Sequence, residues 1–417
     1  MSELKRPAPI PLDDAIMRLL AYAQPCLKAE AVSTFEADGR VLAQAVVSPL
    51  TVPPHDSSAM DGYAVRVADC AAPGVLLPVS QRIPAGQVGV PLAPGTAARI
   101  FTGAPVPEGA DAVVMQEEAQ ALDPESGADV FGRVRINVAP ASGCCIRRAG
   151  EDVRSGSVVL AAGQRLTPAA LGLAASVGCA QLQVARRPRV ALLSTGDELA
   201  MPGEIAPEAM PPGAIYNSNR FFLRALLRRQ GCEVRDLGVT PDRYEATLAA
   251  LREAAAHSDV IVTTGGVSVG EEDHIKAAVQ ALGTLELWSL AIKPGKPFAY
   301  GRIGAAHLCA LPGNPVASFV TFLLLVRPFL LRLQGATQTA PCTMMVRAGS
   351  DGPRAGARRE FLRARIGATG ALELFLNQSS GVLSSVVWGE GLIDVPPNQP
   401  FKAGDMVRFI PFAPLLA

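Results

Sequence analysis

The sequence lacks both a charge excess and a long apolar segment, and each absence excludes a class of protein. Its 38 basic residues equal its 38 acidic ones, whereas a nucleic-acid binder usually has a basic excess. The longest apolar run, 316–326, is too short to cross a bilayer. Residues 1–20 contain Asp13 and Asp14 and have no apolar signal-peptide core. We therefore expect a cytoplasmic protein with neither a nucleic-acid nor a membrane partner.

Cysteine patterns that bind zinc or form disulfide frameworks are also missing. The eight cysteines show no C-x-x-C spacing, and the chain has only four histidines, so we expect free thiols in a reducing compartment. The adjacent pair Cys144–Cys145 fits a packing role better than a reactive site. The sequence is, by contrast, long and rich in the turn-forming residues glycine and proline. Its 417 residues, 49% hydrophobic, with 39 glycines and 35 prolines, predict roughly two to four domains with many short strands.

The stretch 258–318 organises the chain. An apolar run at 259–263 predicts a buried parallel strand, and a glycine-rich turn at 264–270 follows it. Two further glycine-bearing turns, at 293–297 and 311–315, also follow strand-like runs. Three such turns within about sixty residues predict one ligand crevice at the strand ends of an open α/β sheet.

These turns have the chemistry of an anion site. Glycine lets backbone N–H groups approach a phosphate. Asn314 is placed to cap the next helix, with Pro315 at its first position, so the positive end of that helix would face the ligand. Lys293 and Lys296 lie on a loop stiffened by proline, and the acidic group 271–273 suits magnesium. Each turn alone is more often an ordinary turn, but all three in this order favour a phosphate-binding crevice. The sequence contains neither a P-loop nor a G-x-G-x-x-G motif, which excludes these two nucleotide-binding families.

Strand and helix runs alternate around this stretch, which predicts a multidomain α/β protein with a central, doubly wound, mostly parallel sheet. Asp242 and Glu245 resemble a capping box for the helix they begin. Residues 75–153 predict a small inserted β module, and a linker at 334–341 precedes a C-terminal β domain without convincing helices. The other expected elements are helices at 7–24, 167–178, 217–230, 242–256 and 275–282, an extended segment at 40–50, and strands at 190–194, 233–239 and 259–263.

Eight motifs match one family in order. They are DSSAMDGYAVR (56–66), RIFTGAPVPEGADAVVMQEE (99–118), RRAGEDV (147–153), STGDEL (194–199), IYNSNR (215–220), TTGGVSVGEEDH (263–274), AIKPGKPFAYG (291–301) and LPGNPVAS (311–318). The chain resembles the MoeA family of molybdopterin molybdenumtransferases, equivalent to the E domain of gephyrin. The resemblance implies that adenylated molybdopterin and molybdate, with Mg²⁺, give molybdenum cofactor and AMP. It also implies a homodimer with a shared active site, and as further partners a molybdopterin adenylyltransferase and apo-molybdoenzymes or their chaperones.

The family layout implies four subdomains in this chain. Residues 188–335 would form the central molybdopterin-binding domain, and residues 336–417 the C-terminal β domain. The two remaining subdomains are discontinuous. They are an N-terminal linker and dimerisation subdomain made of 1–28, 47–55 and 153–187, and an inserted β-rich subdomain made of 29–46 and 56–152.

The resemblance also places the family's functional residues on this sequence. Catalytic residues are expected at Asp61, Thr102, Asp152, Glu198, Asp242 and Asp273, the last three also as magnesium ligands. Molybdopterin-AMP is expected to bind at Thr264, Gly265, Gly266, Ser268, Gly270, Pro312, Gly313, Asn314 and Pro315. Molybdate is expected at Lys293, Lys296, Arg363 and Ser380. In the family, Asp61 and Thr102 enter the site from the partner subunit, which implies a catalytic dimer.

Two positions depart from the family pattern, and two other functions fit parts of the chain. Ser289 stands where many relatives have lysine, and Ala317 where many have serine, with Ser318 one place on, which bears on molybdate affinity and pose. A molybdopterin adenylyltransferase shares the central fold but normally lacks the 56–66 region and the C-terminal domain. A non-enzymatic scaffold, such as gephyrin in receptor clustering, has no need of the acids that this chain retains.

Overall fold

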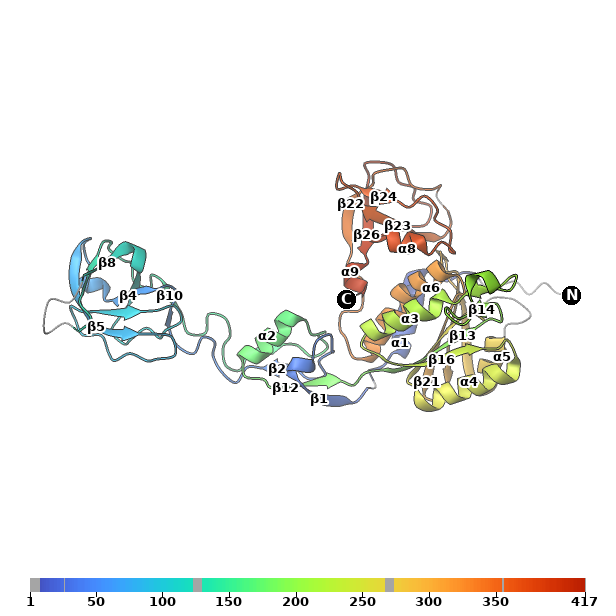
Figure 1. Cartoon of the computed structure of the whole chain (residues 1–417), viewed down its shortest axis with the longest axis horizontal. Coiled ribbons are helices and arrows are strands. Elements are labelled where there is room, and N and C mark those ends of the chain that lie inside the picture. Colours follow the sequence, from blue (N-terminus) through green and yellow to red (C-terminus); the bar gives the residue numbers. More distant parts are fainter. Residues whose placement is uncertain (1–7, 26, 123–129, 267–273, 355, 417) are drawn as a thin grey trace.

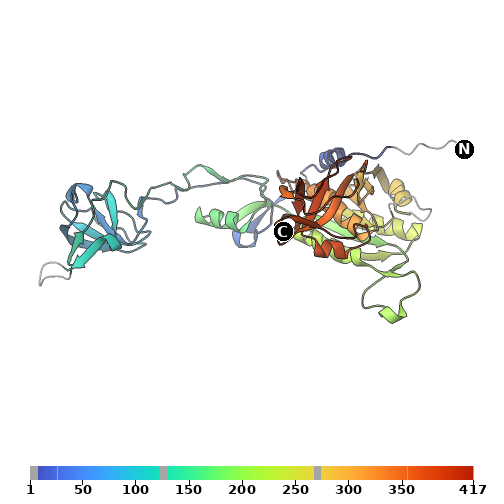
Figure 2. The same cartoon turned by 90° about the horizontal axis from the view of Figure 1, so that it is seen from above.

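The computed structural model describes residues 8–25, 27–122, 130–266, 274–354 and 356–416. The molecule is elongated (Figure 1). An inserted module (57–147) lies at one end, a linking module (29–47 with 158–185) in the middle, and a central domain (189–333) with a C-terminal domain (344–416) at the other end (Figure 2). Two chain segments, bridged between Val52 and Val153, join the linking and inserted modules.

The central domain is built on a six-stranded sheet. Its order is β16 (Glu233–Thr240), β13 (Arg189–Thr195), β17 (Val260–Thr264), β21 (Ala306–Leu311), β20 (Pro297–Ile303) and β18 (Gly283–Ser289). The first four strands are parallel, whereas β20 pairs antiparallel with both β21 and β18. β17 and β21 are buried along their whole length, because helices cover both faces of the sheet. The predicted doubly wound, mostly parallel sheet is confirmed.

Successive side chains of β13 point to opposite faces of this sheet and so enter two different cores. Ala191 and Leu193 share one core with α4 (Tyr244–His257) and α5 (His274–Leu282). Val190 and Leu192 share the other with α1 (Leu12–Tyr22), α3 (Ser218–Arg229) and α6 (Pro315–Thr321). The predicted helices at 217–230 and 275–282 are therefore present, and the N-terminal helix packs on the central domain rather than on the linker subdomain assigned to 1–28.

One continuous helix crosses the core of the central domain. It comprises α6, the π-helical segment η5 (Phe322–Val326) and α7 (Arg327–Leu333). Among the described residues this helix, Pro315–Leu333, is the one long and apolar enough to cross a membrane, and 94% of its apolar stretch is buried inside the fold. The apolar run thus continues past Pro328. The π-helical turn before it suits a residue that lacks a backbone N–H.

The linking module contains two short antiparallel pairs and one helix. β1 (Ala29–Ser33) pairs with β12 (Gln181–Ala185), and β2 (Val46–Val47) pairs with β11 (Val158–Leu160). α2 (Pro168–Ser176) begins as predicted, with Pro168 at its first position and the Thr167 hydroxyl accepting from the Ala170 N–H. The assignment of 29–46 to the inserted module was wrong. Leu42 and Val46 share a core with Leu160 and Leu182 instead, because distant segments pair to bury these apolar faces.

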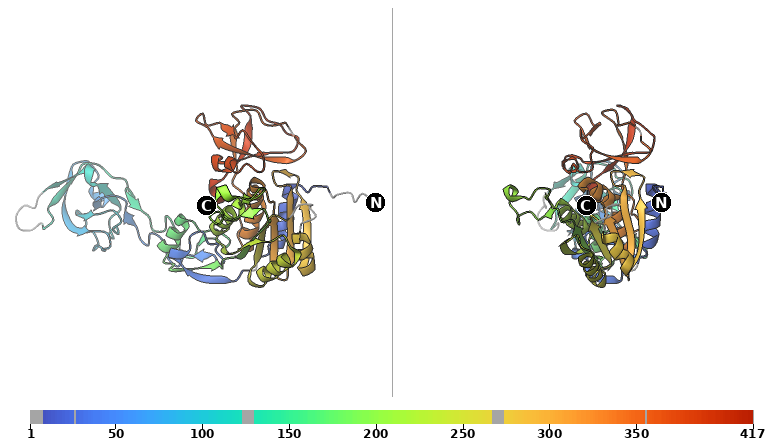
Figure 3. Two further views of the ribbon diagram at one scale, coloured as in Figure 1. Left: turned by 45° about the vertical axis from the view of Figure 1, so that its right-hand side comes forward. Right: turned by 90° about the vertical axis from the view of Figure 1, so that its right-hand side faces the viewer.

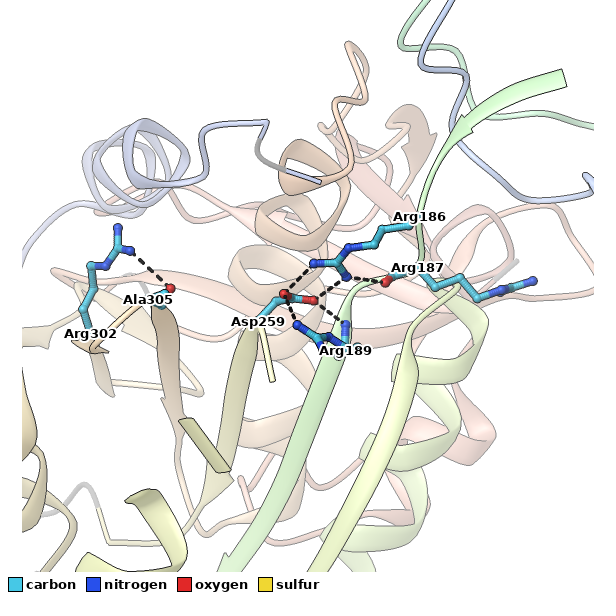
Figure 4. Close-up of polar contacts among 6 residues, drawn as sticks. All are labelled: Arg186, Arg187, Arg189, Asp259, Arg302 and Ala305. Carbon is cyan, nitrogen blue, oxygen red and sulfur yellow. Dashed lines mark hydrogen bonds and ion pairs between the residues drawn. The ribbon is translucent and has the colours of Figure 1, made fainter. Parts of the chain in front are cut away.

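Asp259 fastens the linking module to the central sheet (Figure 4). Its carboxylate accepts two hydrogen bonds from the Arg186 guanidinium, at 2.8 and 2.7 Å, and one from the Arg189 backbone N–H at 2.8 Å. Burial acts to raise the pKa of Asp259, but these hydrogen bonds outweigh it and lower the pKa to about 2. The ion pair lies at the amino end of β17, which is the end of the sheet opposite the glycine-rich turns.

The inserted module is a six-stranded mixed sheet, as the predicted β module requires. Its order is β7 (Ala112–Met115), β4 (Gly62–Val65), β6 (Ala97–Ile100), β5 (Val75–Ile83), β9 (Arg133–Ile136) and β8 (Ala119–Leu122). A two-residue pair, β3 (Ser57–Ser58) with β10 (Ile146–Arg147), joins the two entering segments. Figure 3 shows this module projecting away from the other domains.

The C-terminal domain is a second sheet joined to the central domain by one short strand. Its order is β19 (Ile292–Lys293), β23 (Arg359–Ile366), β25 (Gly391–Val395), β26 (Met406–Pro411) and β22 (Met344–Arg347), with β24 (Leu372–Leu374) on β23. β19 comes from the central domain. The sheet therefore connects the loop 293–297, called the lysine loop below, to the C-terminal domain. Two short helices, α8 (Ser384–Trp388) and α9 (Ala413–Leu416), correct the expectation of a domain without helices.

Candidate functional site

A cavity of about 690 Å³ opens at the carboxyl ends of β13, β17 and β21. Three loops that follow these strands line it, at 195–198, 264–266 and 312–315. β14 (Leu199–Ala200) and β15 (Ile215–Tyr216) form a further wall. Gly381 adds a contact from the C-terminal domain. Ligands of open α/β sheets bind at this edge, so the predicted crevice exists and brings together Thr264, Gly265, Gly266, Pro312, Gly313, Asn314 and Pro315.

Two positions of the turn after β17 require glycine, because a side chain there would clash with neighbouring atoms. Gly265 has φ +93°, and a Cβ there would lie 2.7 Å from the carbonyl oxygen of Thr195. Gly266 has φ +65°, and a Cβ there would lie 2.6 Å from Cγ1 of Ile275. Backbone in this region favours glycine. The turn therefore needs glycine at both positions to pack against Thr195 and Ile275 while it lines the cavity.

Asn219 ties three parts of the cavity wall together. Its Nδ2 donates to Oγ1 of Thr264 at 2.8 Å and to the carbonyl oxygen of Gly313 at 2.7 Å. Asn217 caps the same helix, α3, with its side-chain oxygen accepting from the Arg220 N–H. We assigned neither asparagine a role from the sequence. The motif 215–220 contains both residues and was the sequence signal that could have pointed to them. Both side chains are buried, and both residues line the cavity.

Two of the predicted catalytic acids, Glu198 and Asp242, lie on the cavity wall. Asp242 and Asp197 form a reciprocal pair, in which each backbone N–H donates to the other carboxylate, at 3.0 and 3.3 Å. Burial first, then repulsion by the carboxylates of Asp197 and Glu198, raise the pKa of Asp242. Asp242 does not cap α4, whose N-cap residue is Arg243 without a side-chain cap, because the Asp242 carboxylate is committed to Asp197.

The N-terminus of α6 meets the cavity but is not capped as predicted. Pro315 occupies the first helical position, whereas the Asn314 side chain makes no capping hydrogen bond. The Val316 N–H donates instead to the carbonyl oxygen of Ser380, at 3.0 Å. The backbone of Ser380 therefore contacts the start of α6, and its expected role in molybdate binding stays a prediction. The loop 379–381 of the C-terminal domain is docked on the start of α6.

The lysine loop lies beside this helix. Gly295 has φ +107°, and a Cβ there would lie 2.5 Å from Oγ1 of Thr321, so the loop packs directly on α6. Lys293 and Lys296 are both exposed, and Nζ of Lys293 lies 3.3 Å from a carboxylate oxygen of Glu360. The hydroxyl of Thr321 is buried without a hydrogen-bond partner among the described residues.

Arg363 is arranged differently from the predicted oxyanion ligand. It is 1% exposed, and burial lowers its pKa to about 10. Its guanidinium donates to Oγ of Ser385 and to the carbonyl oxygens of Phe361 and Ser379, at 3.0 to 3.2 Å. The guanidinium therefore binds the loop 379–381, and its N–H groups are directed to protein partners rather than to the cavity.

Asp61 and Thr102 lie together, but on the inserted module. Oδ1 of Asp61 accepts from both the backbone N–H and the hydroxyl of Thr102, each at 2.8 Å. The backbone hydrogen bond first, and then the hydroxyl, lower the pKa of Asp61. Figures 1 and 2 show the inserted module at the opposite end of the molecule from the central domain, whose loops line the cavity. Asp152 is exposed on the segment that joins the linking and inserted modules, where its N–H donates to Val52.

The remaining predicted site residues, Ser268, Gly270 and Asp273, lie outside the described residues, as does the acidic group 271–273. Within the described part of the chain, no three His, Cys, Asp or Glu side chains are grouped to hold a metal ion. The seven cysteines described there are free, as expected, and the sulfur atoms of Cys144 and Cys145 lie 3.8 Å apart.

Three family models together match most of the chain. The MoeA N-terminal region (domain I and II) matches residues 10–178, a probable molybdopterin binding domain matches 191–332, and the MoeA C-terminal region (domain IV) matches 345–412. The solved structure of a molybdopterin biosynthesis moeA protein from Pyrococcus horikoshii OT3 is similar, with a TM-score of 0.82 and 28% identity, covering 97% of this chain and all of that one.

Curated relatives agree with the family models. A molybdopterin molybdenumtransferase from Haemophilus influenzae is 42% identical over 328 residues, which are 78% of this chain and 78% of that protein. Molybdopterin molybdenumtransferase 2 from Mycobacterium tuberculosis is 38% identical over 395 residues, which are 91% of this chain and 94% of that protein. The chain belongs to the MoeA family of molybdopterin molybdenumtransferases.

Proposed function

We propose that this protein inserts molybdenum from molybdate into adenylated molybdopterin and releases AMP, with Mg²⁺ as cofactor. The observation that carries the proposal is the cavity at 195–198, 264–266 and 312–315, which joins a glycine turn, a helix N-terminus and two carboxylates. Backbone N–H groups and the helix dipole favour a phosphate there. The relatives' names give molybdenum transfer to molybdopterin. The adenylated substrate, the AMP release and the Mg²⁺ are our proposal, with which the cavity's chemistry is consistent.

The donor set fits magnesium. Glu198 and Asp242 place two carboxylates on one wall, and Mg²⁺ is usually held by one or two carboxylates together with substrate phosphates. Burial and the neighbouring carboxylates of Asp197 and Glu198 raise the pKa of Asp242, so a bound cation would stabilise its ionised form. Glu198, Asp242 and, by resemblance, Asp273 would hold the ion. When bound, it would neutralise charge on the adenylyl phosphate.

The chain's own groups would bind and orient the nucleotide. Thr264, fixed by Asn219, and the backbone of Gly265 line the cavity and would lie beside the phosphates. We assign molybdate to the lysine loop, where Lys293 and Lys296 bring two positive charges next to α6. The loop 379–381 closes this side, and Arg363 positions it from within the C-terminal domain.

The active unit in our proposal is a homodimer. Asp61 and Thr102 belong to the inserted module, which lies at the opposite end of the molecule from the central domain that lines the cavity, so a second copy would supply them. The linking module offers an apolar surface for such contact, since Phe35 is 95% exposed and the paired residues Val47 and Val158 are 51% and 59% exposed. Unpaired apolar surface of this kind marks protein interfaces.

The proposed substrate and product imply two kinds of partner protein. A molybdopterin adenylyltransferase would supply the substrate, and apo-molybdoenzymes or their chaperones would take the product. We assign the protein to the cytoplasm, whose reducing conditions would keep the seven described cysteines free.

The test is anaerobic incubation of the protein with adenylated molybdopterin, Mg²⁺ and molybdate. We expect AMP release that depends on both ions, and a product that reconstitutes an apo-molybdoenzyme. Pyrophosphate release from ATP and molybdopterin would identify an adenylyltransferase instead. Binding of a receptor peptide without any AMP release would identify a scaffold.

A further inference from the structure

Two arginines of the inserted module face each other across neighbouring strands. In the register of β5 and β6, Arg82 lies directly beside Arg99, and Arg99 lies beside Tyr63 of β4. Like charges in directly opposed positions of a sheet destabilise it. The pair therefore calls for a compensating interaction, and Arg99 itself has no role assigned so far.

One aromatic ring holds both guanidinium groups. The guanidinium carbons of Arg82 and Arg99 lie 4.6 and 4.7 Å from the ring centroid of Phe101. Arg99 also lies 5.1 Å from the ring of Tyr63. Such stacking fixes the plane of a guanidinium while leaving N–H groups at its edge available for other partners.

Neither arginine is neutralised by a carboxylate. Among the described residues, no Asp or Glu oxygen lies within ion-pair distance of Arg82 or Arg99. Arg99 donates to the carbonyl oxygen of Gly62 and to Oε1 of Gln116, both uncharged. Arg82 is exposed and makes no hydrogen bond to the described part of the chain. Two positive charges without an ion-pair partner among the described residues thus lie side by side.

This surface adjoins Asp61 and Thr102. Thr102 follows Phe101 directly, and Arg99 is among the charges that lower the pKa of Asp61. Gly103, next in the chain, has φ +82° with no atom within 4 Å of a Cβ position, so the turn is open. The arginines, the carboxylate and the hydroxyl therefore lie on one open surface.

We propose that Arg82 and Arg99, stacked on Phe101, bind a tetrahedral oxyanion of the substrates next to Asp61. Planar guanidinium groups match the oxygens of phosphate and of related oxyanions, and charge-assisted hydrogen bonds to them are strong. The oxyanion is either a phosphate of the nucleotide or molybdate. The role in turnover rests on the proposed function, in which the inserted module completes the site of a second copy.

The experiment compares full-length Arg82→Gln with Arg135→Gln. Arg135 is a matched control, because it is an exposed arginine on β9 of the same module, without an ion pair or ring contact to the described residues. AMP release is measured while adenylated molybdopterin or molybdate is varied in turn. Calorimetric titrations with AMP alone and with molybdate alone separate the two sources of oxyanion.

We expect Arg82→Gln to raise KM for one of the two substrates about tenfold, the loss of one charge-assisted hydrogen bond. The matching titration should weaken by a similar factor, and Arg82→Lys should recover part of it. Arg135→Gln should change neither. The thermal midpoint of Arg82→Gln should stay level or rise, because a like-charge neighbour is removed.

Equal behaviour of Arg82→Gln and Arg135→Gln in both assays would overturn the inference. So would a weaker dimer in sedimentation with unchanged KM, since the arginines would then pair with carboxylates of the second copy. A wild-type protein that releases no AMP contradicts the proposed function, not this surface. In that case the titrations decide, and loss of AMP or molybdate binding in Arg82→Gln alone still supports the oxyanion site.

Discussion

Asp242, on the cavity wall, is a residue whose charge opposes folding. Its raised pKa means that the ionised carboxylate is less stable in the folded protein than in the unfolded chain, so ionisation near neutral pH lowers the free energy of unfolding. The substitution Asp242→Asn removes this charge and keeps an oxygen for the Asp197 N–H. We predict a higher thermal midpoint at pH 7, together with a loss of turnover of roughly two orders of magnitude.

Calorimetry and AMP release on the same preparation check this prediction. Glu245→Gln serves as the control, because Glu245 is exposed in the first turn of α4 and absent from the cavity wall. A destabilised Asp242→Asn protein would contradict our account of the charge.

Asp259 makes the opposite contribution, at the far end of the sheet. Its pKa is about 2 in the folded protein, against about 4 in an unfolded chain. Its ion pair therefore stabilises the fold fully above about pH 4, and this stability is lost as the pH falls toward 2. We predict that Asp259→Asn lowers the free energy of unfolding by about 2 kcal/mol at pH 7 and by progressively less toward pH 2.

Urea unfolding at several pH values between 2.5 and 8 measures this difference. Asp38→Asn, an exposed carboxylate of the linking module without a hydrogen bond to the described residues, is the control. A difference between wild type and Asp259→Asn that stays constant with pH would rule out the ion pair as its source.

Single residues also show what a sequence can predict. Gly265 and Pro315 were predictable, because their backbone roles depend on local chain geometry. Asn219 was not assigned, because its two partners lie 45 and 94 residues away and only the folded chain brings them together. The burial of Arg363 and its protein partners were not predicted, because they follow from the packing of a whole domain.

At the scale of elements, the glycine turn after β17 offers a test of the crevice. Gly265→Ala combines a positive φ with a Cβ that would lie 2.7 Å from the Thr195 carbonyl oxygen. Gly304→Ala in the β20–β21 turn has a positive φ, +59°, with no atom within 4 Å, so it isolates the backbone strain. We predict a cost of about 1 kcal/mol for Gly304→Ala and about 3 kcal/mol for Gly265→Ala.

Chemical denaturation of both variants, with AMP titrations, measures this contrast. Gly265→Ala should also bind AMP more weakly than wild type, whereas Gly304→Ala should not. Equal stabilities would mean that the turn after β17 has space that the structure does not show.

The strands and helices of the central domain were predicted well, because the alternation of buried runs with amphipathic runs is local. The end of the helix at 315–333 was not, since proline in an apolar run normally stops a helix. Here the π-helical segment before Pro328 carries the helix through it. The pairing of β1 with β12 was also missed, because it joins residues about 150 positions apart, which no local pattern records.

At the scale of the whole molecule, the elongated shape leaves apolar surface that a second copy would cover. Phe35 is 95% exposed, so its replacement should change the fold of one subunit little. We predict that Phe35→Asp weakens the homodimer at least about tenfold without lowering secondary-structure content. Val88→Asp, at an 81% exposed residue of the inserted module, is the control. Sedimentation at several concentrations decides, and an unchanged dimer in Phe35→Asp would place the interface elsewhere.

Subunit mixing tests the central claim, that two copies build one active site, most directly. Asp61→Asn and Asp242→Asn proteins are each expected to be inactive, and they are mixed under conditions that allow subunit exchange. If Asp61 of one copy serves the cavity of the other, half of the dimers in an equal mixture contain one intact site, and about a quarter of wild-type AMP release returns. The account predicts this recovery. A mixture that stays as inactive as its components, although sedimentation or tagging shows mixed dimers, would contradict it.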